Sequence, residues 1–220
     1  GQSATSAIMG DIVHLPDGDM TLHVEMRCGA PIERVDIFNG LDLVETIRPY
    51  RQDELGSRIR VVWEGAEYRG RFRQVIWDGS AFLSDNEIIT ATPINFFNKD
   101  KMLEKPASNE LRWKALTTGN VGGFDIILAD AYNGTLKIET PLIKAGVPIE
   151  DIGFEDEVFD NSGVLPRYLK IFRLPTENPH KTMRFSRLID LKAVGDNPIF
   201  IRLTQEDGTL VWTSPLSVYR

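Results

Sequence analysis

The sequence predicts an all-β protein with an antiparallel β-sandwich architecture. Apolar and polar residues alternate with a period of two along most of the chain, and turn residues separate these stretches at short intervals. An amphipathic helical pattern is not sustained anywhere, and one helical turn at 148–153 is the only helix expected. Short strands separated by turns are typical of sandwiches and barrels. We expect two packed sandwiches, immunoglobulin-like or jelly-roll-like, with one enlarged sandwich as the alternative.

The first half of the chain contains about seven of the expected strands. Residues 32–38 and 43–47 are joined through Asn39-Gly40, which is the strongest short-range signal for a hairpin. Strand pairing is therefore expected to begin near the amino terminus. The other strands of this half are expected at 20–26, 57–63, 68–77, 82–83 and 88–96.

The alternating pattern breaks over residues 98–110, which are polar, mixed in charge and include a proline. Such a segment indicates a linker or a long surface crossing. We therefore expect one sandwich domain at 11–100 and a second at 108–220. Residues 1–10 are expected to be a tag remnant and a disordered leader that follow a cut inside a longer protein. The strands of the second half are expected at 111–116, 123–129, 134–140, 158–159, 168–173, 183–191, 199–204 and 210–219.

The composition excludes several classes of function. The net charge is -7, which argues against a general nucleic-acid binder because phosphate contacts need concentrated positive charge. No stretch approaches the roughly 18 consecutive apolar residues of a membrane span. Cys28 is the single cysteine, so an intrachain disulfide is impossible, and a small apolar strand residue is the expected role.

Motifs for catalysis or metal binding are missing from the sequence. The three histidines are widely separated, the motif Gly-x-Ser-x-Gly is absent, and Cys28 has no neighbouring base. The glycine-rich residues 119–123 lack the order of a phosphate-binding loop, so a hairpin loop is expected. The acidic residues between 150 and 160 lack the ligand spacing of a calcium loop, so a solvated face is expected. We therefore predict no catalytic residue, no metal ligand and no cofactor in this chain.

Arginines and aromatic residues form the sharpest local pattern. Residues 57–63 and 68–77 are expected to pair as a hairpin around Glu64-Gly65, which would place five arginines on one sheet face beside three aromatic side chains. The arginines could be solvated or ion-paired, could dock onto another domain or subunit, or could bind an anionic or sugar ligand. The candidate residues for a ligand site or a domain interface are Arg58, Arg60, Arg69, Arg71, Arg73, Trp63, Tyr68 and Trp77.

Several segments resemble the carboxy-terminal region of a large bacterial family of uncharacterised proteins. The amino-terminal part of that family is similar to PHP-type (polymerase and histidinol phosphatase) metal-dependent phosphoesterases. The resemblance implies that a catalytic domain precedes this chain, holds the divalent metal and is its partner. None of the metal-ligating His and Asp residues of such a domain has a counterpart here. The matching segments, in family order, are 30–40, 58–71, 77–79, 113–125 and 205–215.

Two functions from different classes follow. The resemblance implies a non-catalytic accessory β domain that packs on a metal-dependent, hydrolase-like domain or shapes its cleft. The alternative is a stand-alone module that binds a carbohydrate or an anionic ligand. Exposed rings at Trp63, Tyr68 or Trp77 would favour the binding module, and buried rings would favour a scaffold. A hydrolase that uses Glu64 and Glu67 as paired carboxylates is less favoured, because turn residues are the expected role of both.

Overall fold

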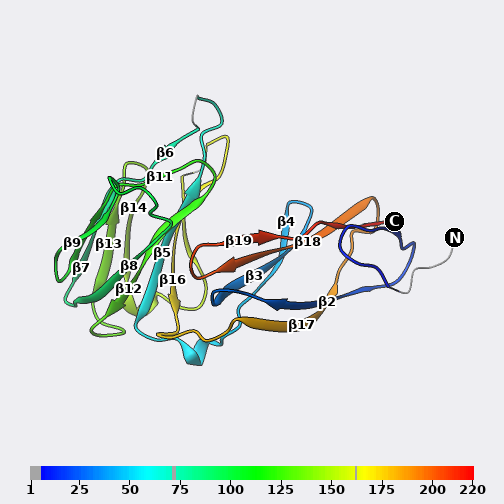
Figure 1. Ribbon diagram of the computed structural model, residues 1–220, viewed down its shortest axis with the longest axis horizontal. Helices are drawn as coiled ribbons and strands as arrows, with labels where there is room; N and C mark the ends of the chain where they lie inside the picture. Colours follow the sequence, from blue (N-terminus) through cyan, green and yellow to red (C-terminus); the bar gives the residue numbers. More distant parts are fainter. Residues whose placement is uncertain (1–5, 71–72, 162) are drawn as a thin grey trace. The chain divides into compact units, whose positions relative to one another are not determined.

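The computed structural model describes residues 6–70, 73–161 and 163–220, and these residues form several sheets in which all strand pairs but one are antiparallel (Figure 1). The predicted all-β sandwich architecture is confirmed. Helical structure within the described ranges is limited to two 3-10 turns, η1 (Gln52–Glu54) and η2 (Ile149–Asp151). The second of these lies inside the predicted turn at 148–153. No helix in the described part of the chain is long and apolar enough to cross a membrane.

The chain divides into two compact units. Gly1–Tyr50 and Pro179–Arg220 form the first, which we call the terminal unit, and Arg51–Asn178 form the second, which we call the inserted unit. This division differs from the predicted domains at 11–100 and 108–220. Strands β7 (Gly79–Ser84) and β10 (Glu110–Trp113) lie on opposite sides of the predicted boundary, yet they pair directly with each other.

Residues 98–110 are not a linker between domains. They contain a loop and then strand β9 (Leu103–Ala107), which pairs with β10 at one edge of a sheet. Four of the five β9 residues are exposed. An exposed edge strand carries polar and charged side chains and tolerates proline, so its composition is the same as that of a linker.

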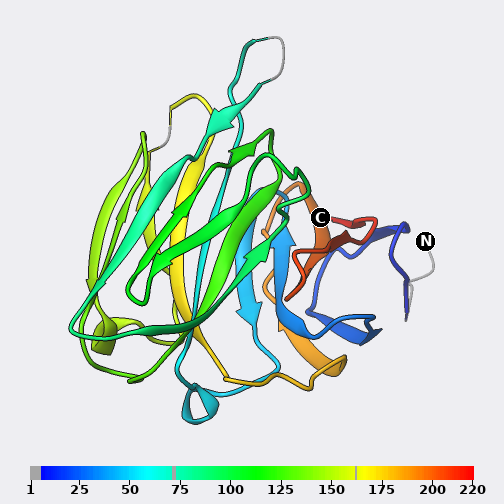
Figure 2. The ribbon, with the colours of Figure 1, turned by 60° about the vertical axis from the view of Figure 1, so that its left-hand side comes forward.

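The inserted unit is built from two five-stranded sheets (Figures 1 and 2). The strand order is β15-β16-β5-β12-β8 in one sheet and β14-β13-β7-β10-β9 in the other. A separate two-stranded sheet joins β6 (Val75–Ile76) to β11 (Leu116–Thr117). The remaining strands of this unit are β5 (Arg58–Gly65), β8 (Ile88–Ile94), β12 (Val121–Leu128), β13 (Thr135–Glu139), β14 (Lys144–Pro148), β15 (Glu157–Asp160) and β16 (Arg167–Leu174).

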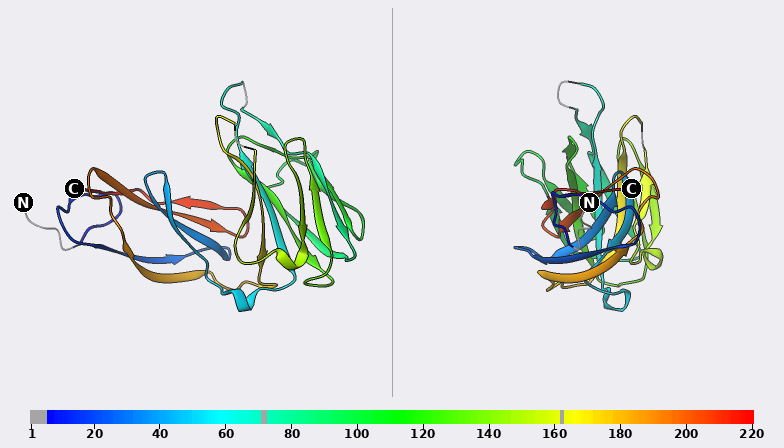
Figure 3. Two further views of the ribbon diagram at one scale, coloured as in Figure 1. Left: turned by 180° about the vertical axis from the view of Figure 1, so that it is seen from behind. Right: turned by 90° about the vertical axis from the view of Figure 1, so that its right-hand side faces the viewer.

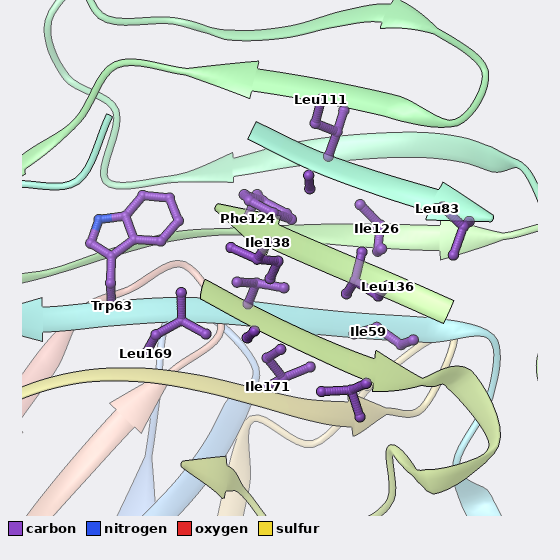
Figure 4. Packing of buried hydrophobic residues seen from close by; sticks show 14 of the residues in the cluster. Ile59, Trp63, Leu83, Leu111, Phe124, Ile126, Leu136, Ile138, Leu169 and Ile171 are labelled. Carbon is purple, nitrogen blue, oxygen red and sulfur yellow. The ribbon is translucent and has the colours of Figure 1, made fainter. Parts of the chain in front are cut away.

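One hydrophobic core is shared by the two five-stranded sheets. Alternate residues of β5, among them Ile59 and Trp63, point into it from one sheet, and Ile138 of β13 points into it from the other (Figure 4). All three side chains are fully buried. The period-two pattern of the sequence thus becomes the facing surfaces of a sandwich.

The terminal unit combines a six-stranded sheet with a two-stranded one. Strands β2 (Met20–Arg27) and β17 (Thr182–Ile189) run side by side as the smaller sheet (Figure 3). The hydrophobic core of the terminal unit includes Leu22 of β2 and Ile189 of β17. The six-stranded sheet has the order β1-β20-β18-β3-β4, with β19 paired to β18, and consists of β1 (Ile12–His14), β3 (Ile32–Asn39), β4 (Asp42–Ile47), β18 (Asp196–Gln205), β19 (Leu210–Trp212) and β20 (Leu216–Tyr219).

The hairpin predicted at Asn39-Gly40 is confirmed. Strands β3 and β4 pair on either side of it, and Gly40 has a φ of 63°, which glycine adopts without steric strain. The strand predicted at 210–219 is interrupted. Its first part, β19, pairs with the second half of β18, and its last part, β20, pairs with the first half.

Candidate functional site

The hairpin predicted around Glu64-Gly65 does not form. Strand β5 pairs with β12 on one edge and with β16 on the other, so no edge is left for residues 68–77. The close approach of β12 depends on glycine, since a Cβ on Gly123 would lie 2.3 Å from the carbonyl oxygen of Val61. Within 68–77 only β6 is a strand in the described part of the chain.

The buried arginine of β5, Arg60, has a structural role. The guanidinium of Arg60 is buried and donates two hydrogen bonds to the carboxylate of Asp125, with Nε to Oδ1 at 2.7 Å and Nη2 to Oδ2 at 2.8 Å. This fork geometry is that of a strong, charge-assisted pair. Arg58 is half-buried two residues earlier on the same strand.

The other predicted arginines lie on the segment that follows β5. Arg69 is exposed, and its Cζ lies 5.4 Å from the ring centroid of the half-exposed Tyr68. Arg73 is exposed and has a φ of 51°, which is a turn conformation. Arg71 lies outside the described residues. The structure therefore does not bring the four described arginines of the prediction together on one sheet face.

The carboxylates considered for a hydrolase are held in ion pairs. Glu64 lies 2.9 Å from the Nζ of Lys170, and Glu67 accepts a hydrogen bond of 2.9 Å from Nη2 of Arg167. No group of three or more His, Cys, Asp or Glu side chains among the described residues could hold a metal ion. Burial raises the pKa of the Cys28 thiol, which reduces the thiolate needed for nucleophilic attack.

Trp63, Trp77 and Trp113 form the centre of the core of the inserted unit. Of the three predicted aromatic residues only Tyr68 has an exposed ring, and the complete burial of Trp63 and Trp77 favours a scaffold role for these two side chains. The rings of Trp63 and Trp113 stack with centroids 5.4 Å apart, and Trp77 lies 6.4 Å from Trp63. The indole N–H of Trp77 donates to Thr117 Oγ1 at 2.9 Å, and that of Trp113 donates to the Trp77 carbonyl oxygen at 2.5 Å. Two of the three indole N–H groups are thus satisfied inside the protein.

Trp63 differs from its two neighbours. Its Nε1 is buried and has no hydrogen-bond partner among the described residues. In Figure 4 this nitrogen lies on the edge of the ring that faces away from the other labelled side chains. A buried indole N–H without a partner is costly unless a water molecule or a ligand accepts its hydrogen bond.

A pocket adjoins Trp63. Its volume is about 310 Å³, and its wall comes from β5, from the loop after β8, from the connection between β10 and β11, and from the loop before β12. The pocket therefore combines three stretches of the sequence, at Trp63, at 95–101 and at 114–122. The lining residues are Trp63, Asn95, Phe96, Phe97, Asn98, Lys101, Lys114, Ala115, Leu116, Thr118, Asn120 and Gly122.

Hydrogen bonds shape the loop after β8. Asn95 has a φ of 60°, and its Nδ2 donates to the carbonyl oxygen of Val121 at 2.8 Å. Asn98 Oδ1 accepts from the backbone N–H of Asp100 at 2.9 Å. This arrangement leaves the ring of Phe97 in the pocket wall while 86% of the residue is exposed. A large aromatic ring held at a pocket mouth is available to a ligand.

The pocket residues outside the arginine pattern were missed by the sequence analysis. Lys101 belongs to the segment interpreted as a linker, and Lys114 and Asn120 belong to segments interpreted as a strand and a hairpin loop. The available signal was Phe96-Phe97 at the start of a polar loop, because exposed aromatic residues in loops are enriched at binding surfaces.

The chain matches no protein-family model, no curated protein and no solved structure. The resemblance to the PHP-associated family, and the accessory role that it implies, therefore remain predictions.

Replacing Gly122 with alanine should displace Trp63. The new Cβ would lie 2.8 Å from Trp63 Nε1 and 3.3 Å from Cε2, which a rigid ring in a packed core cannot easily accommodate. We expect a loss of about 1–3 kcal/mol in the free energy of unfolding, measured by denaturant titration. Gly146→Ala in β14 is the control, since its Cβ would approach Lys137 Cγ no closer than 4.0 Å. Equal stability of the two variants would contradict the close packing of Trp63 on Gly122.

Proposed function

We propose that the inserted unit is a saccharide-binding module and that the pocket beside Trp63 is its site. The observation that carries the proposal is a pocket that is lined by the exposed aromatic ring of Phe97 and adjoins Trp63, whose buried indole N–H has no partner among the described residues. Its volume of about 310 Å³ falls at the lower end of the range for small-molecule sites, roughly 300–1,000 Å³.

The side chains of the pocket suit the two chemical features of a sugar. A sugar ring has apolar C–H faces, which pack on aromatic rings such as Phe96 and Phe97, and it carries hydroxyl groups around its edge. Amide side chains such as Asn98 and Asn120 bond to hydroxyls as donors and acceptors. A pocket with aromatic walls and a few placed polar groups is the usual construction of a small-ligand site.

Binding to an array of neutral and acidic glycans, followed by calorimetric titration of the strongest ligand, tests this proposal. Phe97→Ala should weaken the affinity about tenfold, because the exposed ring makes ligand contacts but little core contact. Phe82→Ala is the matched control, since Phe82 is half-exposed on β7 and does not line the pocket. Absence of binding across the array, or an equal loss of affinity in both variants, would refute the proposal.

A saccharide-binding role is compatible with the accessory role that the family resemblance implies. In that case the binding module would hold a substrate near a preceding metal-dependent, hydrolase-like domain, and the immunoglobulin-like or jelly-roll-like description would apply to its sandwich. Hydrolysis of a phosphoester by the present chain alone, with zinc or manganese added, would contradict a purely accessory role.

A further inference from the structure

The polar groups that line the Trp63 pocket are mainly hydrogen-bond donors. Two lysines, Lys101 and Lys114, line it together with Trp63, whose buried indole N–H has no hydrogen-bond partner among the described residues. The amide oxygens of Asn98 and Asn120 each already accept one backbone N–H bond of 2.9 Å, from Asp100 and Thr118, so their NH2 groups are the less engaged part of each amide. A ligand that satisfies these groups must supply acceptors.

The pocket is also positively charged in an acidic protein. The chain has a net charge of -7, yet no Asp or Glu among the described residues lines this pocket. Lys101 is half-buried and Lys114 is exposed, and neither forms an ion pair with any described residue. Two lysines in the wall of a pocket that has no carboxylate in its described lining attract an anion, and their ammonium groups can form charge-assisted hydrogen bonds with it.

A neighbouring cavity shows that this charge pattern is local. That cavity shares Lys114 but is lined by Asp78, Asp100 and Glu104 as well as by Lys99 and Arg112. Its acidic and basic side chains are equal in number. The excess of positive charge is therefore a property of the Trp63 pocket and not of the whole surface around it.

We infer that the ligand of this pocket is an anionic saccharide, one that carries a carboxylate or a phosphate. This inference rests on the proposed saccharide-binding function and adds the charge of the ligand to it. Lys101 and Lys114 bind the anionic group, and the exposed ring of Phe97 packs on an apolar sugar face. Lysine suits either anion because its ammonium acts as a compact point charge.

The test compares ligands that differ in charge but share a sugar framework. Calorimetric titration of the full chain uses tetragalacturonate against its methyl ester, and glucose 6-phosphate against glucose. We expect at least one acid to bind about tenfold more tightly than its neutral counterpart, and the difference to shrink as the salt concentration rises. The pair that shows the difference identifies the anionic group as a carboxylate or as a phosphate.

Variants that remove one positive charge show which lysines cause the tighter binding of the acid. Lys101→Met and Lys114→Met should each weaken binding of the preferred acid about tenfold and leave binding of its neutral counterpart unchanged. Lys137→Met is the matched control, because Lys137 is an exposed lysine of β13 outside this pocket. Circular dichroism and the unfolding midpoint confirm that the three variants are folded.

The outcomes separate this inference from the function on which it rests. If the neutral and acidic ligands bind equally, and Phe97→Ala weakens both, the saccharide-binding function stands and the anionic class is overturned. If the acid binds more tightly but Lys101→Met and Lys114→Met have no effect, the placement of the anion is overturned. If none of the four ligands and no array glycan binds, both proposals fail together.

Discussion

Replacing Arg173 with methionine is expected to destabilise the inserted unit by at least about 3 kcal/mol. The guanidinium is buried in β16 and donates to four carbonyl oxygens, with distances between 2.6 and 3.0 Å. Its Cζ also lies 5.2 Å from the ring centroid of Tyr132. Methionine fills similar space but donates no hydrogen bond, so carbonyl groups would lose their partner without gaining water. The four carbonyls belong to Gly56, Ala131, Ile149 and Ile152.

A second variant at Arg173 separates the contribution of hydrogen-bond geometry to stability from the contribution of charge. Burial lowers the pKa of Arg173 from its ordinary value, because the guanidinium loses contact with water. Arg173→Lys keeps a positive charge but replaces the planar fork by one nitrogen, so it should lose most of the stability that Arg173→Met loses. Arg112→Met is the surface control, since the Arg112 side chain is 62% exposed and its ion pair with Glu110 should contribute about 0–1 kcal/mol. A lysine variant as stable as the original chain would show that charge alone is sufficient.

Denaturant titration followed by tryptophan fluorescence measures these losses of stability in the inserted unit. Trp63, Trp77 and Trp113 are all buried in the inserted unit, whereas Trp212 lies in the terminal unit and is 56% exposed. Unfolding of the inserted unit therefore moves three buried rings into water. The fluorescence transition reports the stability of that unit.

Local patterns in the sequence were sufficient to predict strands and the turn at Asn39-Gly40. The alternation in 32–38 and the residues Asn39-Gly40 specify a strand and a hairpin through interactions within a few residues. Pairing over longer distances was not accessible in the same way. Strand β5 has the sequence of a hairpin partner for 68–77, but β12 and β16 occupy its edges, and both come from more than 50 residues further along the chain.

The division into two units also depends on strand pairing between residues that are far apart in the sequence. A polar segment can be a linker or an exposed edge strand, and composition does not distinguish them. The pairing of β3 with β18 joins the two ends of the chain and makes the terminal unit discontinuous. No short-range feature of residues 32–39 specifies a partner at 196–205.

The candidate site illustrates the same limit. Trp63 was predicted from its place beside the arginines, whereas in the structure it is a buried core residue that lies next to a pocket. Lys101 and Lys114 come from segments that only the folded sandwich brings to Trp63. A pocket assembled from several loops leaves no spacing pattern in the sequence.

Replacing Trp77 with alanine is expected to cost about 3–5 kcal/mol in the free energy of unfolding of the inserted unit. The ring is fully buried, and its removal leaves a cavity beside Trp63. The loss of hydrogen bonds adds to this cost. The hydroxyl of Thr117 accepts a hydrogen bond from the Trp77 N–H and donates one to the carbonyl oxygen of Gly65 at 2.7 Å, so the alanine variant leaves this hydroxyl without its donor. Fluorescence of the remaining buried tryptophans follows the transition.

Two comparison variants show which part of Trp77 matters. Trp77→Phe keeps much of the ring volume but leaves the Thr117 hydroxyl without its donor, so it should lose less stability than Trp77→Ala but more than a surface change. Trp212→Ala removes an exposed tryptophan and should change the stability by no more than about 0.5 kcal/mol. If Trp77→Ala were as stable as Trp212→Ala, Trp77 would not be a core residue. A ring that fills the core and anchors Thr117 has to show a loss in both Trp77 variants, and the alanine variant has to show the larger one.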